Sequence, residues 1–286
     1  MIWNAVIITV FLAGICILLY PSVSDLWNSY LNEKTVTAYD SAVSKYPSSV
    51  LKKEFRKARA YNEQHVTNTI RDAFDNDNYI KTHPYSDLLN PGGDGVMGYL
   101  EIPKIREKIV IYHGTGDKAL QRRSGHVEGT SLPIGGKDTH AVIAAHRGLP
   151  SAKLFSSLDE MQKGDEFYIT ILNRKMAYEV DKIKVVTPED ISDFAIYRNR
   201  DYVTLLTCTP YGVNSHRLLV RGHRVRYKNH DRLNSVSRKL LNLWQLKVVF
   251  AVIALFISFL LIRYITTQIG RARVGKECRS RWSPYH

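Results

Sequence analysis

The chain has 286 residues, a formal net charge of +13 at pH 7 and a hydrophobic content of 44%. This length is enough for one sizeable globular domain with appendages. Only three cysteines are present, Cys16, Cys208 and Cys278, which excludes a small domain stapled by several disulfides. There is no internal repeat, no low-complexity tract and neither of the metal-binding spacings C-x-x-C and H-E-x-x-H.

Two apolar segments predict membrane-spanning helices. The first, residues 1–20, carries no charged side chain and is long enough to cross a bilayer. It could be a signal peptide, but it lacks a basic n-region and a clear small-x-small cleavage site before Pro21, which favours an uncleaved anchor. The second is residues 241–263. Its only charged residues are Lys247, near the start, where the side chain can snorkel, and Arg263 at the last position.

Basic residues set the predicted orientation of the chain. The tail, residues 264–286, is rich in Arg and Lys and has Glu277 as its one acidic residue. By the positive-inside rule the tail is cytoplasmic, and two spans then place residues 21–240 outside the membrane.

A basic cluster precedes the second span. Some of its members lie in the juxtamembrane linker, which is residues 229–240. Its members are Arg226, Lys228, Arg232, Arg238 and Lys239. The cluster fits attraction to an anionic lipid or cell-wall surface, or a merely solvated linker. Charge alone would also permit nucleic acid, but an outward-facing domain argues against that partner.

Residues 21–95 read as a helical region. Ser24 and Asp25 predict a helix start, and Pro47 predicts a break before a second helix. In this second helix the apolar residues Leu51, Phe55, Ala58 and Tyr61 recur at three- and four-residue steps. They predict a face that packs on the rest of the domain. The turn cluster at 90–95 ends the region.

Residues 96–228 change to a β pattern. Short β-rich runs are separated by Gly, Pro, Asp and Asn clusters: 96–102, 108–113, 140–146, 166–172, 177–186, 201–207 and 216–227. One helical insert is expected at about 152–161. Seven or eight strands in a segment of this length predict a mainly β fold with a closed or nearly closed barrel.

Cys208 is the one cysteine predicted to face the oxidising side of the membrane. It has no partner there for an intrachain disulfide, so it is either an inert small core residue or a nucleophile. A thiolate nucleophile needs a base or cation nearby. His146 ends the apolar run AVIAAH, as Cys208 ends VTLLT, so both lie where a strand gives way to a loop. Arg217 lies on the returning strand and could stabilise an oxyanion or carboxylate.

These residues lie in segments that resemble the sortase family. The stretch TLLTCTPYGVNSHRLLVRG, residues 204–222, is similar to the sortase signature T-L-x-T-C followed by an Arg, and its HRLLVRG part resembles the class C, pilus-assembling sortases of Gram-positive bacteria. Four segments earlier in the chain also match that subgroup, in the same order: MGYLEIPKI (97–105), IYHGT (111–115), GHVEGTSLPIGG (125–136) and AHRGLPSAKLF (145–155).

The resemblance implies an eight-stranded sortase-type barrel, N-terminal helices and two flanking transmembrane helices. It implies Cys208 as nucleophile, His146 as proton-transfer partner and Arg217 as oxyanion or substrate stabiliser. Thr207 and Thr209 would support the oxyanion or substrate, with the Thr209 backbone N–H as a second donor. The substrates would be pilin subunits with an LPxTG-like sorting signal, joined through a thioacyl-enzyme to a lysine amine of the next pilin. No metal or organic cofactor is implied, and we expect a monomeric catalytic domain at the cell membrane.

One departure from the class C pattern concerns the lid that precedes the barrel. Relatives carry an Asp-Pro-aromatic motif there, and the nearest match in this chain is His83-Pro84-Tyr85, in which a His cannot offer Arg217 a carboxylate. Tyr85 could instead belong to the Y-x-x-L-L-N stretch of the subgroup, and the segment 75–95 could be a plain link. The sequence therefore predicts a more open site than that of a lidded relative.

Four alternatives remain at this level. A housekeeping sortase that anchors proteins to the cell wall shares the signature, although the two spans and HRLLVRG favour class C. An L,D-transpeptidase would place Cys and Arg in one S-H-G-C-x-R run, and a papain-like enzyme would place its His after the Cys. In a non-enzymatic membrane scaffold Cys208 would be a core residue.

Overall fold

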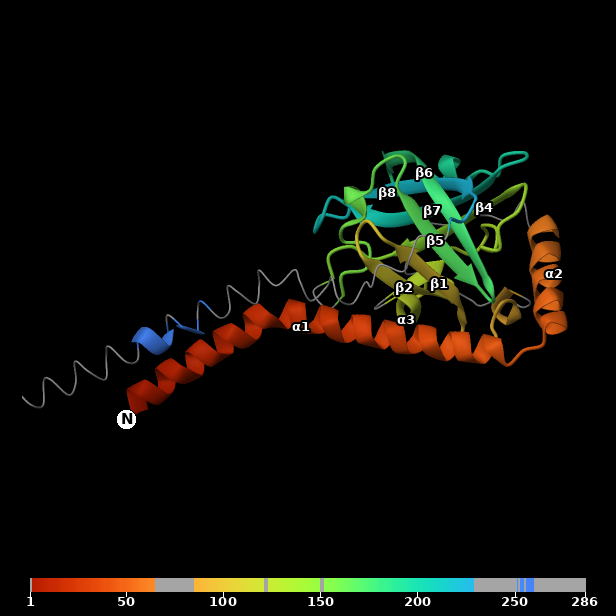
Figure 1. The fold of residues 1–286 in the computed structure, drawn as a ribbon. Helices are drawn as coiled ribbons and strands as arrows, with labels where there is room; N and C mark the ends of the chain where they lie inside the picture. The colour runs from red at the N-terminus through yellow and green to blue at the C-terminus, as the bar shows by residue number, and fades with distance from the viewer. Residues whose placement is uncertain are drawn as a thin grey trace, which may run out of the picture. The chain divides into compact units, whose positions relative to one another are not determined.

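The computed structural model describes residues 2–64, 85–120, 123–149 and 152–228, together with helical positions between 251 and 259. The chain divides into two units, Met1–His230 and Asp231–His286. The first unit holds all the named elements (Figure 1), in the order α1 (Ile2–Ser44), α2 (Ser48–Gln64), η1 (Tyr85–Asp87), β1 (Val96–Ile102), β2 (Glu107–His113), α3 (Asp117–Leu120), β3 (Ser124–His126), β4 (Thr139–Ala145), η2 (Leu158–Glu160), β5 (Glu166–Ile171), β6 (Arg174–Val186), η3 (Ser192–Phe194), β7 (Asp201–Thr209) and β8 (His216–Val225).

The eight strands form a closed barrel, as the sequence predicted. Their order around the barrel is β1-β2-β3-β4-β7-β8-β6-β5. The pairs β2–β3 and β4–β7 are parallel, and the other pairs are antiparallel. Consequently β1, β4, β6 and β7 run in the same direction and finish at one end of the barrel. Closure leaves no exposed sheet edge.

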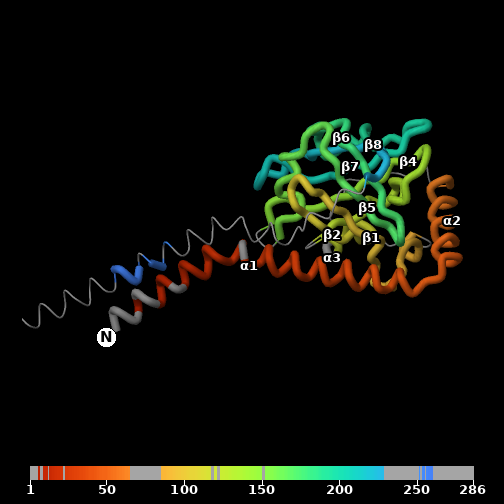
Figure 2. The backbone as a smooth tube through the Cα atoms, in the orientation of Figure 1, coloured from red at the N-terminus to blue at the C-terminus, as the bar shows by residue number. Residues whose placement is uncertain are grey.

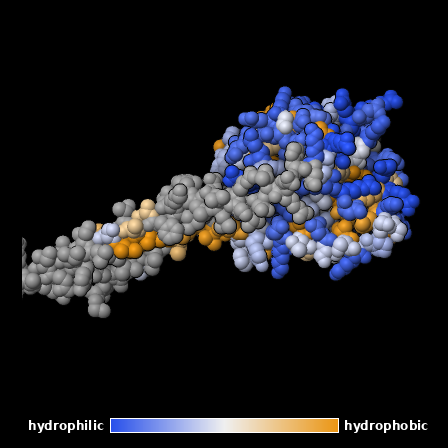
Figure 3. Space-filling view, in the orientation of Figure 1, coloured by the Kyte–Doolittle hydropathy of each residue, from blue (hydrophilic) through white to orange (hydrophobic). Residues whose placement is uncertain are grey.

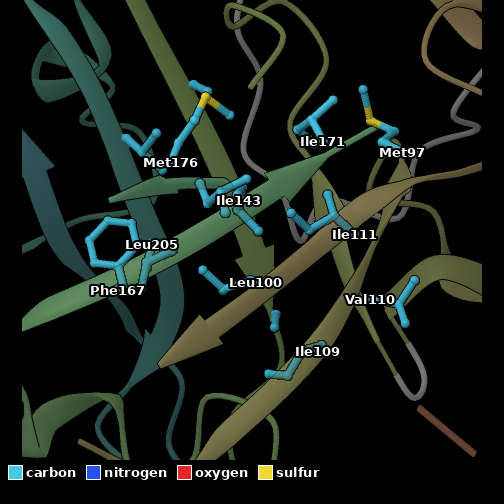
Figure 4. Packing of buried hydrophobic residues seen from close by; sticks show 14 of the residues in the cluster. Met97, Leu100, Ile109, Val110, Ile111, Ile143, Phe167, Ile171, Met176 and Leu205 are labelled. Atoms are coloured by element: carbon cyan, nitrogen blue, oxygen red, sulfur yellow. The ribbon is translucent and has the colours of Figure 1, made fainter. Parts of the chain in front are cut away.

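The barrel interior is filled by aliphatic and aromatic side chains from all sides (Figure 4). Leu100, Ile109, Ile143 and Leu205 are each 0% exposed. Glycine is required where an aromatic ring crosses β8, because a Cβ at Gly222 would come within 2.6 Å of the Phe167 ring. Packing of this density makes the barrel a rigid support for the loops at its ends.

Helix α1 lies along the barrel and α2 follows after a sharp turn (Figures 1 and 2). The buried face of α1 consists of Asn28, Asn32, Val36, Tyr39 and Val43. The Tyr39 hydroxyl donates to the carbonyl of Met97 at 2.6 Å and accepts from the N–H of Leu172 at 2.7 Å. The helix is therefore fastened to β1 and to the turn after β5.

The predicted break at Pro47 and the buried face of α2 are confirmed. Leu51, Phe55, Ala58 and Tyr61 are all buried. Asn62 adds two hydrogen bonds to Leu132, at 3.2 Å to its carbonyl and 2.8 Å from its N–H. The face therefore packs on the barrel as its periodicity required.

Two predicted elements are wrong. No helix starts at Ser24, because α1 begins at Ile2 and runs through Pro21 to Ser44 without interruption. The expected helix at 152–161 is reduced to the 3₁₀ turn η2, while Ala152 and Leu154 are buried separately from it. α1 tolerates Pro21 within the helix, at the cost of one backbone hydrogen bond. In 152–161 the backbone leaves the right-handed helical region at Leu154, which has φ +43° and a buried side chain.

The described part of the chain contains one helix that is long and apolar enough to cross a membrane, within Thr9–Ser44. The predicted second span and the cytoplasmic tail lie outside the described residues, apart from the helical positions between 251 and 259.

Two buried histidines make barrel stability depend on pH. Burial lowers the pKa of His126 and of His140 to about 4. Since unfolded histidines titrate near ~6.5, the unfolded state binds more protons as the pH falls from that value towards the folded pKa. We expect the free energy of unfolding to fall with acidification in this window, with a slope of at most about 2.7 kcal/mol per pH unit for the two groups.

Urea unfolding of the detergent-solubilised chain at about pH 7 and about pH 5 measures this effect. His216 is exposed, so His216→Gln serves as the control for replacing a histidine at the surface. A free energy of unfolding that is the same at both pH values would contradict the prediction.

Candidate active site at the ends of β4 and β7

The barrel brings together the three residues predicted to carry the chemistry. β4 and β7 are parallel neighbours, with Ala144 beside Leu206, so His146 and Cys208 both follow at the same end. β8 pairs with β7 on its other side, and Arg217 is the register partner of Cys208. Three adjacent strands thus deliver a thiol, an imidazole and a guanidinium to one rim, a result that depends on strand order and not on spacing in the chain.

Cys208 is buried, with 7% exposure. This exposed fraction alone does not test the predicted openness relative to a lidded sortase, because part of the lid segment lies outside the described residues, and that expectation stays a prediction. Directly before it, the Thr207 hydroxyl donates to the carbonyl of Ala145 at 2.7 Å. This bond ties β7 to β4 next to both His146 and Cys208, so the Thr207 side chain holds the two strands in register.

Arg217 is partly exposed at the start of β8. Its Nη1 donates to the carbonyl of Asn214 at 3.1 Å and to that of His216 at 3.2 Å. Both carbonyls belong to the β7–β8 connection, so the guanidinium is held against this turn beside Cys208. A guanidinium carries five N–H donors in a planar fork, which suits it to bind an oxyanion or a carbonyl oxygen.

Arg147 is a site residue that the sequence reasoning missed. Its side chain is 9% exposed, and its Nη2 lies 2.5 Å from Oδ2 of Asp159. Its Nη1 donates to Oγ1 of Thr209 at 3.0 Å. Arg147 therefore connects the residue after His146 with the residue after Cys208. The signal available in the sequence was a charged residue directly after His146 in AHRG.

The loop after β4 and the loop after β7 also touch through Gly148 and Tyr211. Gly148 has φ +80°, and a Cβ there would lie 3.1 Å from the Tyr211 ring. Any larger residue would thus need both an unfavourable backbone and a displaced ring. Tyr211 itself remains 61% exposed, so its outer side is open at the rim.

Of the three predicted lid residues, His83 and Pro84 lie outside the described part of the chain. Tyr85 begins η1 and is 1% exposed in the hydrophobic core. Its hydroxyl lies 2.8 Å from Nδ1 of His126 and accepts the N–H of Gly114 at 3.0 Å. These contacts attach Tyr85 to the far ends of β2 and β3, in agreement with the alternative that it belongs to the Y-x-x-L-L-N stretch.

The histidines of β2, β3 and β4 have structural surroundings. His126 Nε2 lies 2.8 Å from the carbonyl of Ser131, and His140 Nδ1 lies 2.9 Å from the carbonyl of Ala195. Nε2 of His113 lies 2.6 Å from the carbonyl of Leu88. A carbonyl can only accept, so each ring must donate from that nitrogen. These contacts fix the rings within the core, whereas His146 lies at the rim.

Comparison with known proteins shows the family to which the chain belongs. Residues 100–225 match the Sortase domain. Sortase C1 of Streptococcus agalactiae is 43% identical, with a TM-score of 0.63 over 68% of this chain and 96% of that one. Sortase C of Streptococcus pneumoniae is 44% identical, with a TM-score of 0.65 over 69% of this chain and 100% of that one.

A curated relative, sortase D of Bacillus subtilis, is 29% identical over 140 residues, which cover 48% of this chain and 68% of that protein. The identity to the two sortase C structures is thus higher and extends over nearly all of their length. Together with the closed barrel and the Sortase domain match, these similarities show that the chain belongs to the sortase family.

Proposed function

We propose that this protein is a class C sortase, a cysteine transpeptidase that cleaves an LPxTG-like sorting signal in pilin subunits and joins them into a pilus. The observation that carries the proposal is the register pairing of Cys208 with Arg217, next to the strand that ends at His146. A solved sortase with 42% identity is described as pilus-related, which supports the pilin substrate over cell-wall anchoring.

The first half of the reaction is cleavage. The Cys208 thiolate attacks the carbonyl carbon of the Thr–Gly bond, and the developing oxyanion is stabilised by Arg217 and by the Thr209 backbone N–H. The C–N bond then breaks, a thioester to Cys208 forms, and His146 gives its proton to the departing glycine amine.

The second half is transfer. A lysine amine of the next pilin attacks the thioester, loses a proton to His146 and displaces the Cys208 thiolate, which leaves an isopeptide bond. Water competes poorly when the amine is held in position and the groove is dry. The reaction uses no metal or organic cofactor, because the thiol is the nucleophile.

We place the catalytic barrel outside the cell membrane. The apolar half of α1 would be the N-terminal anchor, the second span at 241–263 the C-terminal one, and the basic tail cytoplasmic. The long apolar helix in the described part of the chain supports the N-terminal anchor.

The test is incubation of the full chain with candidate pilins, followed by mass spectrometry. The expected products are a thioester on Cys208 and a peptide cross-linked from Thr to Lys. A cross-link to a cell-wall peptide in place of a pilin lysine would favour the housekeeping sortase. The absence of any acyl adduct on Cys208 with every candidate would count against the enzyme.

Arg147 is expected to act as a positioning residue. Arg147→Ala removes the ion pair with Asp159 and the hydrogen bond to Thr209 that links the two catalytic loops, so we expect kcat to fall ~10- to 100-fold with KM changed less than about threefold. Arg147→Lys should recover part of the loss, since it keeps the charge near Asp159 without the planar fork.

Steady-state kinetics with a sorting-signal peptide measure this split between kcat and KM. The exposed Lys163 lies in the same connection and serves as the control, because Lys163→Ala should leave both constants unchanged. An Arg147→Ala enzyme with unchanged kcat would show that the bridge has no role in positioning.

A further inference from the structure

Helix α1 joins the apolar anchor to the barrel without a break. It runs from Ile2 to Ser44, its residues up to Tyr20 carry no charge, and the first charged residue is Asp25. Figures 1 and 2 show a bend within α1, and Pro21 lies inside the helix, so the anchor and the part along the barrel differ in direction. The unbroken helix nevertheless keeps the residues directly beyond Tyr20 next to the bilayer.

The first turns beyond Tyr20 have an apolar outer side. Val23, Leu26, Trp27 and Tyr30 are 53–60% exposed, on the side of the helix away from the buried face that begins at Asn28. Figure 3 shows apolar colours along described side chains of the N-terminal part of α1, while the visible barrel face is mostly hydrophilic. Exposed Trp and Tyr next to an apolar span are typical of the lipid–water interface.

The outer side of α1 becomes polar directly after Tyr30. Glu33, Lys34 and Thr37 are exposed there. Nζ of Lys108, in β2, lies 3.4 Å from Oε2 of Glu33. The apolar stripe is thus only about two helical turns long, roughly 10 Å. This length is comparable to the depth of the headgroup region on one side of a bilayer.

Contacts along α1 show which end of the barrel lies beside this stripe. Oδ1 of Asp25 accepts the N–H of Lys153 at 3.3 Å, and Lys153 belongs to the loop that follows His146. Farther along, Tyr39 bonds to Met97 at the beginning of β1. α1 therefore runs opposite to β1, β4 and β7, and its anchor side lies at the end where β4 and β7 finish. In Figure 1 the β7–β8 turn is on the left of the barrel, the side towards which the N-terminal part of α1 extends.

We propose that the catalytic end of the barrel faces the membrane and lies at the level of the lipid headgroups. The helical rise from Tyr20 to Asp25 is only about 7.5 Å, so the loop after His146 sits within one headgroup layer of the hydrocarbon. Two further exposed apolar residues, Tyr211 and Val213, are in the β7–β8 turn at this same end, 61% and 70% exposed. They would meet the interface next to Cys208.

This arrangement selects for a substrate held at the bilayer. A peptide attached to the membrane presents its scissile bond at the height of Cys208, whereas a peptide free in solution must reach a site that lies against the lipid surface. The inference rests on the proposed function for its substrate, but the orientation itself can be measured without any reaction.

The orientation is tested with single labels at opposite ends of the barrel. In the full chain with Cys16→Ser, Cys208→Ala and Cys278→Ser, a donor dye is attached at Val213→Cys in the β7–β8 turn or at Asn173→Cys in the exposed β5–β6 turn. The chain is reconstituted in vesicles of phosphatidylcholine and phosphatidylglycerol that carry an acceptor dye on the headgroups. We expect at least threefold more transfer from position 213 than from position 173.

Equal transfer from both positions, or more from position 173, would overturn the inference while leaving the membrane anchor intact. A chain that does not float with the vesicles would overturn the anchor in the proposed function and the inference with it. The label at position 173 is the matched control, because it lies on the same barrel in the same vesicles and differs only in the end of the barrel to which it is attached.

A second measurement links orientation to the reaction. Seven polar helix-forming residues inserted between Pro21 and Ser22 raise the barrel by about 10.5 Å and keep its helical face nearly unchanged. We expect cleavage of a lipid-anchored LPxTG peptide to fall at least fivefold, with cleavage of the same peptide free in solution unchanged or faster. Equal rates on the anchored peptide before and after insertion would overturn the inference, and an uninserted chain that cleaves neither peptide would overturn the proposed function instead.

Discussion

Replacing Cys208 with alanine is expected to abolish formation of both the acyl-enzyme and the isopeptide product. The methyl group of alanine cannot form a thioester, and the histidine and arginine beside it cannot replace a nucleophile. Folding should persist, because the change removes one buried sulfur atom and costs on the order of 1 kcal/mol of unfolding free energy. Intact-protein mass spectrometry after incubation with a pilin measures the adduct, and thermal unfolding measures the fold.

Cys16→Ala is the matched control. Cys16 is an exposed free cysteine of α1, far along the chain from the barrel, so its loss should leave acylation unchanged. Isopeptide product at the normal rate from a folded Cys208→Ala chain would mean that the barrel is a scaffold and that another protein forms the bond.

Replacing Arg217 is expected to slow acylation by ~10²- to 10³-fold, the loss usual for one oxyanion donor. Arg217 is the register partner of Cys208, and its guanidinium is held by the carbonyls of Asn214 and His216. Arg217→Ala removes the donor, and Arg217→Lys keeps the charge but loses the planar fork, so we expect only partial recovery. Single-turnover rates of thioester formation measure the effect on the chemical step.

Arg221 supplies the control on the same strand. It lies on the same side of β8 as Arg217, and its guanidinium pairs with both oxygens of Asp181 at 2.9 Å. Arg221→Lys should lower stability without changing the acylation rate. If both arginine variants slow acylation equally, the effect comes from the folding of β8 and the oxyanion role of Arg217 is wrong.

Much of the barrel could be predicted from the sequence because its signals are local. The run 96–102 coincides with β1, and the runs ending at 113 and 186 coincide with the ends of β2 and β6. β3 escaped detection because its three residues, Ser124–His126, contain no apolar side chain and owe their strand form to two neighbouring strands. The buried face of α2 was predictable for the same local reason, a helical period of apolar residues.

The sequence by itself also predicted the chemistry of the candidate site, since a thiol, an imidazole and a guanidinium each end or begin an apolar strand and lie in sortase-like segments. Only the tertiary structure decided what surrounds them. Strand order placed Cys208 between His146 and Arg217, and Arg147 bridges two loops that are distant in the chain. The contact between Asp25 and Lys153 places α1 beside the catalytic end of the barrel. These features depend on residues far apart in sequence that meet when the barrel closes, and no local periodicity encodes such a meeting.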